Sequence, residues 1–215
     1  NYACHPSLLG PDNLQYSADY PGALRRYVEK EAPGAMCLFV QGAAGDINPY
    51  RDKEPVSGAG FQAVEEMGTE LGRRVMSLVD SAKPVAPAAM SLASEVLRVG
   101  HRSDAGAAIP IGLTAGVLGD KVCFLALPGE AFVAHQITFR QKSECAMTLF
   151  LGYSYSAGGD WAGYLPTIRA AAEGGYGAGY NTTVEVGAGE MLVDRAIVHL
   201  FKLRGYLKDL PETRF

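Results

Sequence analysis

Polar residues that could bind a metal or take part in hydrolysis lie on glycine- or proline-containing turns at four places in the chain. The four segments are Asn1-Tyr-Ala-Cys-His5-Pro6, Gln41-Gly-Ala-Ala-Gly-Asp46-Ile-Asn48-Pro49, Leu127-Pro-Gly-Glu130, and Asp160-Trp-Ala-Gly-Tyr164-Leu-Pro-Thr167 followed by Glu173-Gly-Gly-Tyr176. Imidazole and carboxylate groups are common zinc ligands. A tyrosine hydroxyl can ligate a metal or stabilise an oxyanion. One His, one Glu and one Tyr on separate loops therefore suggest a single metal site of the kind found in metal-dependent hydrolases.

Glu130 follows an apolar strand pattern and a Pro-Gly turn, at the predicted start of a helix. Ligand-binding and catalytic groups collect at such carboxyl ends of strands. A glutamate at this place is also favoured by the helix dipole alone, and spacing alone makes that structural role the more common one. Both interpretations remain open from this segment taken by itself.

The second segment is similar to a small anion-binding loop, because its glycines allow backbone amides to point at a ligand. It lacks the Lys and the Ser or Thr of a P-loop, which argues against nucleotide binding. Asp46 could bind a cation or orient a histidine, and it could equally cap its own turn. The sequence does not decide between these roles.

His5 precedes a proline that keeps its backbone extended, and neutral imidazole is a common zinc ligand. A lone histidine is more often structural, and we interpret His101, His135 and His199 in that way. Tyrosines on exposed loops are also ordinary. The chain contains no H-E-x-x-H or G-x-S-x-G motif and no Cys/His dyad spacing, which argues against those hydrolase classes.

The composition allows one domain with a full core, or one and a half: 215 residues, of which 48% are hydrophobic. A net charge of −4 argues against nucleic acid and anionic membranes as partners. No apolar run is long enough for a transmembrane helix. The chain starts at Asn1 with neither a start Met nor a signal peptide, so we expect an upstream half, and the compartment is unknown. Cys37 and Cys123 lie in apolar runs and are predicted to be buried, inert thiols, whereas Cys145 gives no signal.

Hydrophobic periodicity and turn residues predict a mixture of helices and strands, which indicates an α/β or α+β layered fold. The glycine and aspartate at positions 119 and 120 favour a tight hairpin turn. The predicted helices are 21–32, 60–80, 130–141 and 189–204, and the predicted strands are 35–40, 89–99, 109–118, 121–127 and 147–153.

Taken in order, the four segments resemble the neutral (non-lysosomal) ceramidase family, especially its compact bacterial relatives. Segment 1–22, with His5 and Ser17-Ala-Asp-Tyr-Pro-Gly22, resembles the part of the family that supplies a zinc-binding histidine, and segment 41–49 resembles its nucleophile loop. By the same resemblance, Glu130 and Tyr164 match a zinc-binding glutamate and tyrosine. Tyr176 matches a second tyrosine that polarises the substrate carbonyl.

The resemblance implies a layered mixed sheet with flanking helices, in which residues 1–215 are the C-terminal portion of a single catalytic domain without the C-terminal β-sandwich. It implies one zinc ion held by His5, Glu130, Tyr164 and a further histidine upstream of the chain. The implied activity is hydrolysis of an amide or ester bond in a small-molecule or lipid substrate. A secreted or periplasmic location is favoured by the resemblance alone, and the oligomeric state is unknown.

The sequence departs from the family at the nucleophile, because Asn48 stands where the family has a serine before Pro49. An amide side chain cannot act as that nucleophile, so we expect metal-activated water to attack the substrate. Asp46, Asn48 and Tyr176 are the predicted catalytic residues under this hypothesis. Two alternatives remain open: a non-catalytic relative that binds a metal or another ligand, and an inactive fragment that needs an upstream half.

Overall fold

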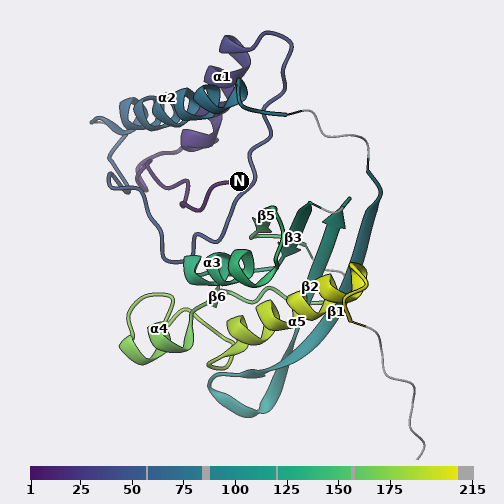
Figure 1. Cartoon of the computed structure of the whole chain (residues 1–215). Helices are drawn as coiled ribbons and strands as arrows, with labels where there is room; N and C mark the ends of the chain where they lie inside the picture. The colour runs from purple at the N-terminus through teal and green to yellow at the C-terminus, as the bar shows by residue number, and fades with distance from the viewer. Residues whose placement is uncertain (57, 84–87, 120, 156–157, 208–215) are drawn as a thin grey trace, which may run out of the picture. The chain divides into compact units, whose positions relative to one another are not determined.

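The computed structural model describes residues 1–56, 58–83, 88–119, 121–155 and 158–207 (Figure 1). The chain divides into two compact units. The sheet unit comprises Asn1–Ala3, Gln41–Asp46 and Pro87–Phe215, and the helical unit comprises Cys4–Val40 and Ile47–Ala86. No helix in the described ranges is long and apolar enough to cross a membrane. The prediction that residues 1–215 form part of a single catalytic domain stays a prediction.

The sheet unit is built on a mixed four-stranded sheet in the order β1-β2-β3-β5 (Figure 1). Its strands are β1 (Met90–His101), β2 (Asp104–Leu118), β3 (Val122–Ala126) and β5 (Met147–Leu151). The first three are antiparallel neighbours, and β5 joins β3 in parallel. The predicted hairpin between β2 and β3 is confirmed by the pairing of Leu118 with Val122. The turn residue at position 120 lies outside the described residues.

Helices α3 (Val133–Lys142) and α5 (Ala188–Leu203) pack on this sheet, and the short helix α4 (Ile168–Glu173) lies in the connection before α5 (Figure 1). The apolar face predicted for the last helix is confirmed, because Leu192, Ala196 and Leu200 are completely buried. The largest fully buried side chains of the sheet-unit core are Phe139, Phe150, Ile111, Leu113, Leu125, Leu127, Leu165, Leu192, Leu200 and Val99. The predicted mixed α/β layering with flanking helices is confirmed.

A charged cluster joins α5 to β1 in the sheet unit. Arg195 donates two hydrogen bonds to Glu95, at 2.6 and 2.7 Å, and His199 Nε2 lies 2.7 Å from Glu95 Oε2. The hydrogen bonds from Arg195 are the main cause that lowers the pKa of Glu95 to about 2, and His199 lowers it further. The structural role predicted for His199 is confirmed by this contact.

We expect Glu95→Gln to lower the melting temperature by roughly 2–4 °C at pH 7, which corresponds to about 1 kcal/mol for a chain of this size. The pKa of Glu95 is lower in the folded state, so ionised Glu95 contributes its full stabilisation above the ordinary pKa of 4.5. That contribution is lost as the pH falls toward about 2. Thermal unfolding of wild type and of Glu95→Gln, recorded from pH 7 to pH 2, measures this loss of stability. The control is Glu173→Gln, which removes a carboxylate from an exposed ion pair. If the difference in melting temperature between Glu95→Gln and wild type stayed constant from pH 7 to pH 2, the stabilising role of ionised Glu95 would be contradicted.

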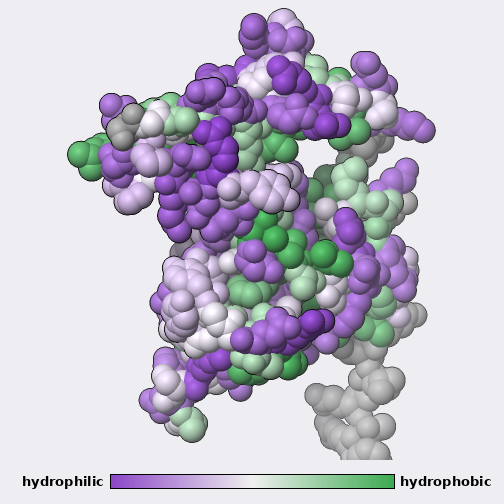
Figure 2. All heavy atoms as spheres, turned by 90° about the vertical axis from the view of Figure 1, so that its left-hand side faces the viewer, coloured by the Kyte–Doolittle hydropathy of each residue, from purple (hydrophilic) through white to green (hydrophobic). Residues whose placement is uncertain are grey.

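The helical unit contains the helices α1 (Asp19–Glu31) and α2 (Gly60–Val79), whose positions agree with the predicted helices. The two helices approach closely at Gly68, where a Cβ atom would collide with Ala23 and with the backbone of α1. On the face shown in Figure 2, the surface over these two helices is mostly hydrophilic. The core of this unit consists of Cys4, Leu8, Tyr20, Ala23, Ala63 and Val64.

The strand predicted at 35–40 is wrong, because these residues form no strand in the structure. Met36 and Leu38 are each 77% exposed. The backbone of Cys37 is held by side chains of α1 instead: its N–H donates to Glu29 at 3.1 Å, and its carbonyl accepts from Arg25 at 2.9 Å. A continuous apolar run fits a buried strand, but the pattern carries no information about whether a neighbouring strand is present to pair with it.

The predicted free thiol at Cys123 is also wrong, because Cys123 forms a disulfide with Cys145, with their Cα atoms 6.1 Å apart. The bond links β3 to the turn before β5. Cys37 is half-buried rather than buried, and Cys4 is buried. Burial raises the pKa of the Cys4 thiol to about 11, with smaller contributions from Asp19 and Asp52.

Candidate functional site

The structure brings Glu130 and Tyr164 together as partners in a short parallel ladder. Strand β4 (Glu130–Ala131) pairs with β6 (Tyr164–Leu165), and the register places Glu130 opposite Tyr164. Partners in register extend their side chains to the same face of the ladder. Backbone hydrogen bonds fix the register: Glu130 N donates to Gly163 O at 2.9 Å, and Phe132 N donates to Leu165 O at 3.1 Å. Two of the predicted metal ligands therefore lie side by side.

Tyr176, the predicted carbonyl-polarising residue, lies next to Tyr164. Their rings meet edge to face with centroids 5.5 Å apart, and the ring of Tyr180 also packs edge to face against Tyr176, at 5.6 Å. Burial is the main cause that raises the pKa of Tyr164, followed by the charge and hydrogen bonding of Glu130 and then by Tyr176. The phenol of Tyr164 is therefore held in its protonated form beside the carboxylate.

Tyr153 also contacts Glu130, although the sequence analysis did not single it out. Its hydroxyl donates to Glu130 Oε2 at 2.8 Å, and its ring packs against Trp161 with centroids 5.6 Å apart. Its backbone has φ of 55°, in the left-handed region that side chains other than glycine rarely adopt. Burial is the main cause that raises the pKa of Tyr153, and Glu130 adds to it. Neither the unusual backbone nor the contact leaves a pattern in the sequence.

The loop 41–46 packs against the Glu130 segment and does not form the expected anion site. Gly45 N donates to Ala131 O at 2.9 Å, and a Cβ atom on Gly45 would collide with the carbonyl oxygen of Glu130. The amides of Gly42 and Ala43 donate to Tyr2 O and to the Gln136 side chain, at 2.9 and 2.8 Å. Because protein atoms already accept from these amides, the expectation that they would hold a ligand is wrong. The glycines serve close packing.

Asp46 caps a neighbouring helix rather than its own turn. Its Oδ1 accepts a hydrogen bond of 2.7 Å from the backbone N–H of Val133, the first residue of α3. Carboxylates are favoured at helix N-termini because they satisfy an unpaired N–H and interact with the helix dipole. Asp46 thus anchors the loop 41–46 to the helix that follows Glu130. Its predicted catalytic role stays a prediction.

His5 belongs to the helical unit, where its main chain and its ring both contact one carbonyl oxygen. Its backbone N–H donates to Ile47 O at 2.9 Å, and Nδ1 lies 3.1 Å from the same oxygen. A carbonyl only accepts, so this contact requires the proton on Nδ1, and in the neutral imidazole Nε2 then carries the lone pair. Metal-binding histidines commonly have this arrangement. The Tyr20 hydroxyl supports the segment by donating to Cys4 O at 2.6 Å.

Asn48 is exposed in the helical unit, and its side chain is held in place by a hydrogen bond. Its Nδ2 donates to Asp52 at 3.0 Å, and the same carboxylate accepts a hydrogen bond from Ser7. Asn48 is therefore oriented by a neighbouring anion, as a polar side chain that contacts substrate or water would need to be.

Two other histidines have contacts that agree with their structural interpretation. His135 is almost completely buried in α3, where its Nε2 lies against Gly189, and burial lowers its pKa. Among the described residues, its Nε2 has no hydrogen-bond partner. His101 Nδ1 accepts a hydrogen bond from Ser103 N at 3.2 Å.

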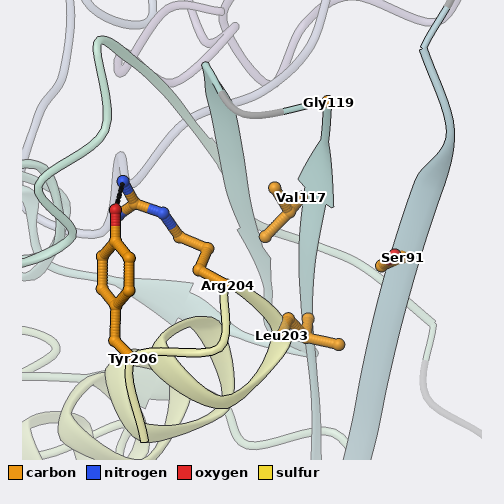
Figure 3. Close-up of a pocket in the computed structure, with 6 residues that line it drawn as sticks. All are labelled: Ser91, Val117, Gly119, Leu203, Arg204 and Tyr206. Atoms are coloured by element: carbon orange, nitrogen blue, oxygen red, sulfur yellow. Dashed lines mark hydrogen bonds between the residues drawn. The ribbon is translucent and has the colours of Figure 1, made fainter.

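Within the described ranges, no three His, Cys, Asp or Glu side chains are grouped so that they could hold a metal ion. A hollow of about 240 Å³ lies between the end of α5 and the sheet, but no predicted site residue lines it (Figure 3). Its cationic residue, Arg204, already donates to Tyr206 Oη and to Ser143 O, at 2.8 and 2.9 Å. The cluster around Glu130 is therefore the better candidate site.

Comparison with known proteins supports the fold. A ceramidase complexed with C2 superposes with a TM-score of 0.77 at 12% identity, and the match covers 99% of this chain and 46% of that one. Neutral ceramidase from Pseudomonas aeruginosa superposes with a TM-score of 0.75 at 14% identity, and the match covers 99% of this chain and 45% of that one. The fold is that of part of a neutral ceramidase. The predicted resemblance to neutral ceramidases is thereby confirmed at the level of the fold.

The chain spans less than half the length of these ceramidases. No protein-family model matches the sequence. No curated protein sequence matches it either. At such low identity the likeness to ceramidases shows the fold alone. The roles of the individual site residues are therefore argued from their own geometry.

Proposed function

We propose that this protein is a zinc-dependent hydrolase of an amide or ester bond, with ceramidase-like chemistry. The observation that carries the proposal is the pairing of Glu130 with Tyr164 in register, within a fold shared with neutral ceramidases. These are two of the three residues of this chain that the sequence resemblance assigns as zinc ligands, the third being His5. Their adjacency depends on strand pairing and was not implied by their positions along the chain.

The side chains in question fit a zinc ion chemically. Glu130 offers a carboxylate, and His5 offers the lone pair of a neutral imidazole. Tyr164 offers a phenol oxygen, and because burial and Glu130 raise its pKa, the zinc ion must displace the phenol proton in order to bind there. That His5 acts as the third ligand, with a further histidine as the fourth, stays a prediction. When bound, zinc supplies Lewis-acid chemistry: it polarises the substrate carbonyl and makes water more acidic.

The chain's own residues have distinct roles in this hypothesis. Glu130 and Tyr164 hold the metal. Tyr176, packed on Tyr164, donates a hydrogen bond to the oxygen of the scissile carbonyl as negative charge develops there. Asn48, held by Asp52, orients the substrate or water through its amide. Asp46 anchors the loop beneath Glu130 to α3.

The proposed substrate is a lipid amide, since the two similar structures are ceramidases. Zinc analysis of the purified chain, together with an assay that follows release of a fatty acid from an N-acyl amide, tests the proposal. Zinc near one per chain with measurable turnover is the expected result. Zinc without turnover would favour the non-catalytic metal-binding relative. If the chain shows no zinc and no turnover, the hydrolase proposal is wrong.

We expect Asn48→Ser to raise amide hydrolysis about tenfold or more, because it restores a hydroxyl nucleophile at the position where neutral ceramidases carry one. The side chain is exposed and its partner Asp52 is close, so a serine fits without repacking. Initial rates on the same N-acyl amide measure the effect, and Asn48→Ala, which has no hydroxyl, is the matched control. Equal rates for the serine and alanine variants would count against the alignment of this loop.

A further inference from the structure

The loop that follows β5 is tied by its backbone to the turn that carries Glu130. Leu127 N donates to Leu151 O at 3.0 Å, Tyr153 N donates to Gly129 O at 3.1 Å, and Ser154 N donates to Leu127 O at 3.0 Å. These three bonds cross between the two segments in both directions. The Cα of Tyr153 is therefore fixed relative to the residue immediately before Glu130.

The backbone of Tyr153 is in an unfavourable conformation for a tyrosine. Its φ of 55° is one that glycine or asparagine adopts at lower cost, because glycine has no Cβ and the short polar side chain of asparagine can hydrogen-bond locally. Strained residues of this kind persist where the surroundings hold them, and they cluster at functional sites. The strain thus points to a role for the tyrosine side chain itself.

The Tyr153 side chain is fixed at both ends and contacts Glu130. Its ring packs against Trp161 at 5.6 Å, with the two planes tilted by 37°. Its hydroxyl donates to Glu130 Oε2 at 2.8 Å. Glu130 is also the ladder partner of Tyr164. Glu130 therefore has two tyrosine neighbours, each attached to a different segment of backbone.

We propose that Tyr153 is a positioning residue, whose hydroxyl fixes the Glu130 carboxylate beside Tyr164 in the orientation that a metal ion requires. The inference rests on the proposed function, since Glu130 is a metal ligand only within it. A carboxylate with several rotatable bonds loses entropy when it binds a metal. A hydroxyl that already restrains it lowers that loss, which is how residues behind the ligands strengthen metal sites.

Tyr153→Phe tests this proposal, because it removes the hydroxyl and keeps the ring, the packing on Trp161 and the backbone conformation. The matched control is Tyr155→Phe in the same loop, where the side chain is 91% exposed. Zinc alone is titrated against a chelating dye in each protein. We expect Tyr153→Phe to bind zinc about tenfold more weakly or worse, and Tyr155→Phe to match wild type. Unchanged zinc affinity in Tyr153→Phe would overturn the proposal.

A second readout does not depend on zinc and separates this proposal from the proposed function. Thermal unfolding is measured without metal for Tyr153→Phe, Glu130→Ala and the double variant. If the hydroxyl restrains the carboxylate, the double variant shifts the midpoint by less than the sum of the single shifts. Additive shifts would overturn the positioning role. If wild type binds no zinc but the shifts are subadditive, the zinc hypothesis fails while the contact between Tyr153 and Glu130 stands as the restraint.

Discussion

Glu130→Gln is expected to abolish zinc binding, with a loss of affinity of about a hundredfold or more, while the fold remains. The substitution keeps the size of the side chain and an oxygen that can accept from Tyr153, but it removes the negative charge that a divalent cation requires. The neutral amide also binds zinc poorly. Zinc titration by calorimetry, together with circular dichroism to verify folding, measures both parts of this expectation.

The control for this experiment is Glu173→Gln in α4, where the same chemical change affects only an exposed ion pair with Arg169. Zinc affinity should be unchanged in this control. His5→Ala tests the third predicted ligand in the same assay. If Glu130→Gln retained the zinc affinity of wild type, the proposed metal site would be wrong even though the fold is that of a ceramidase.

Gly45→Ala is expected to destabilise the sheet unit by about 2 kcal/mol or more, because the added methyl group meets backbone rather than a movable side chain. The new Cβ would collide with the carbonyl oxygen of Glu130. The loop could relieve this collision only by moving away, which would break the hydrogen bond from Gly45 N to Ala131 O. For a chain of this size the melting temperature should fall by roughly 4–8 °C. Zinc affinity should fall too, since the Glu130 segment moves with the loop.

Gly106→Ala in β2 is the matched control, because a Cβ there would meet only the Asp104 side chain, at an ordinary distance of 3.6 Å. Its melting temperature should lie within about 1–2 °C of wild type. A similar small change for Gly45→Ala would show that the loop 41–46 can move away from Glu130 without cost. In that case the supporting role assigned to the loop would be wrong.

Helices α2 and α5 were predictable from sequence because their apolar residues recur with the helical period. The helix predicted at 130–141 starts too early, because Glu130 and Ala131 form strand β4 and α3 begins at Val133, and α4 was not predicted. The spacing of Val64, Met67 and Leu71 predicts the bounds of α2 almost to the residue. The apolar residues of the same helix face become exposed toward its end, at Leu78. Strand 35–40 was predicted wrongly because an apolar run shows a tendency to be buried, whereas a strand requires a partner. The disulfide of Cys123 was missed for the same reason: a single segment does not reveal what lies opposite it.

The candidate site was only partly predictable. Glu130, Tyr164 and Tyr176 could be selected because they stand on turns whose sequences resemble those of the neutral ceramidases. Their adjacency depends on the pairing of β4 with β6, which joins segments far apart in the chain. Tyr153 could not be found, because its importance lies in a left-handed backbone and a single hydrogen bond. Neither of these leaves a periodic or compositional signal.

The parallel ladder of Glu130 and Tyr164 also limits which length changes the chain can tolerate. Successive side chains of a strand point to opposite faces, so a slip of one residue between β4 and β6 would place Ala131 or Leu165 where a site residue now stands. Insertions between these strands are therefore tolerated only if the connecting segment changes its conformation and leaves the register of β4 and β6 unchanged. In related chains, we expect length variation in this connection to be confined to the segment between Tyr153 and Trp161, with both ends kept in register.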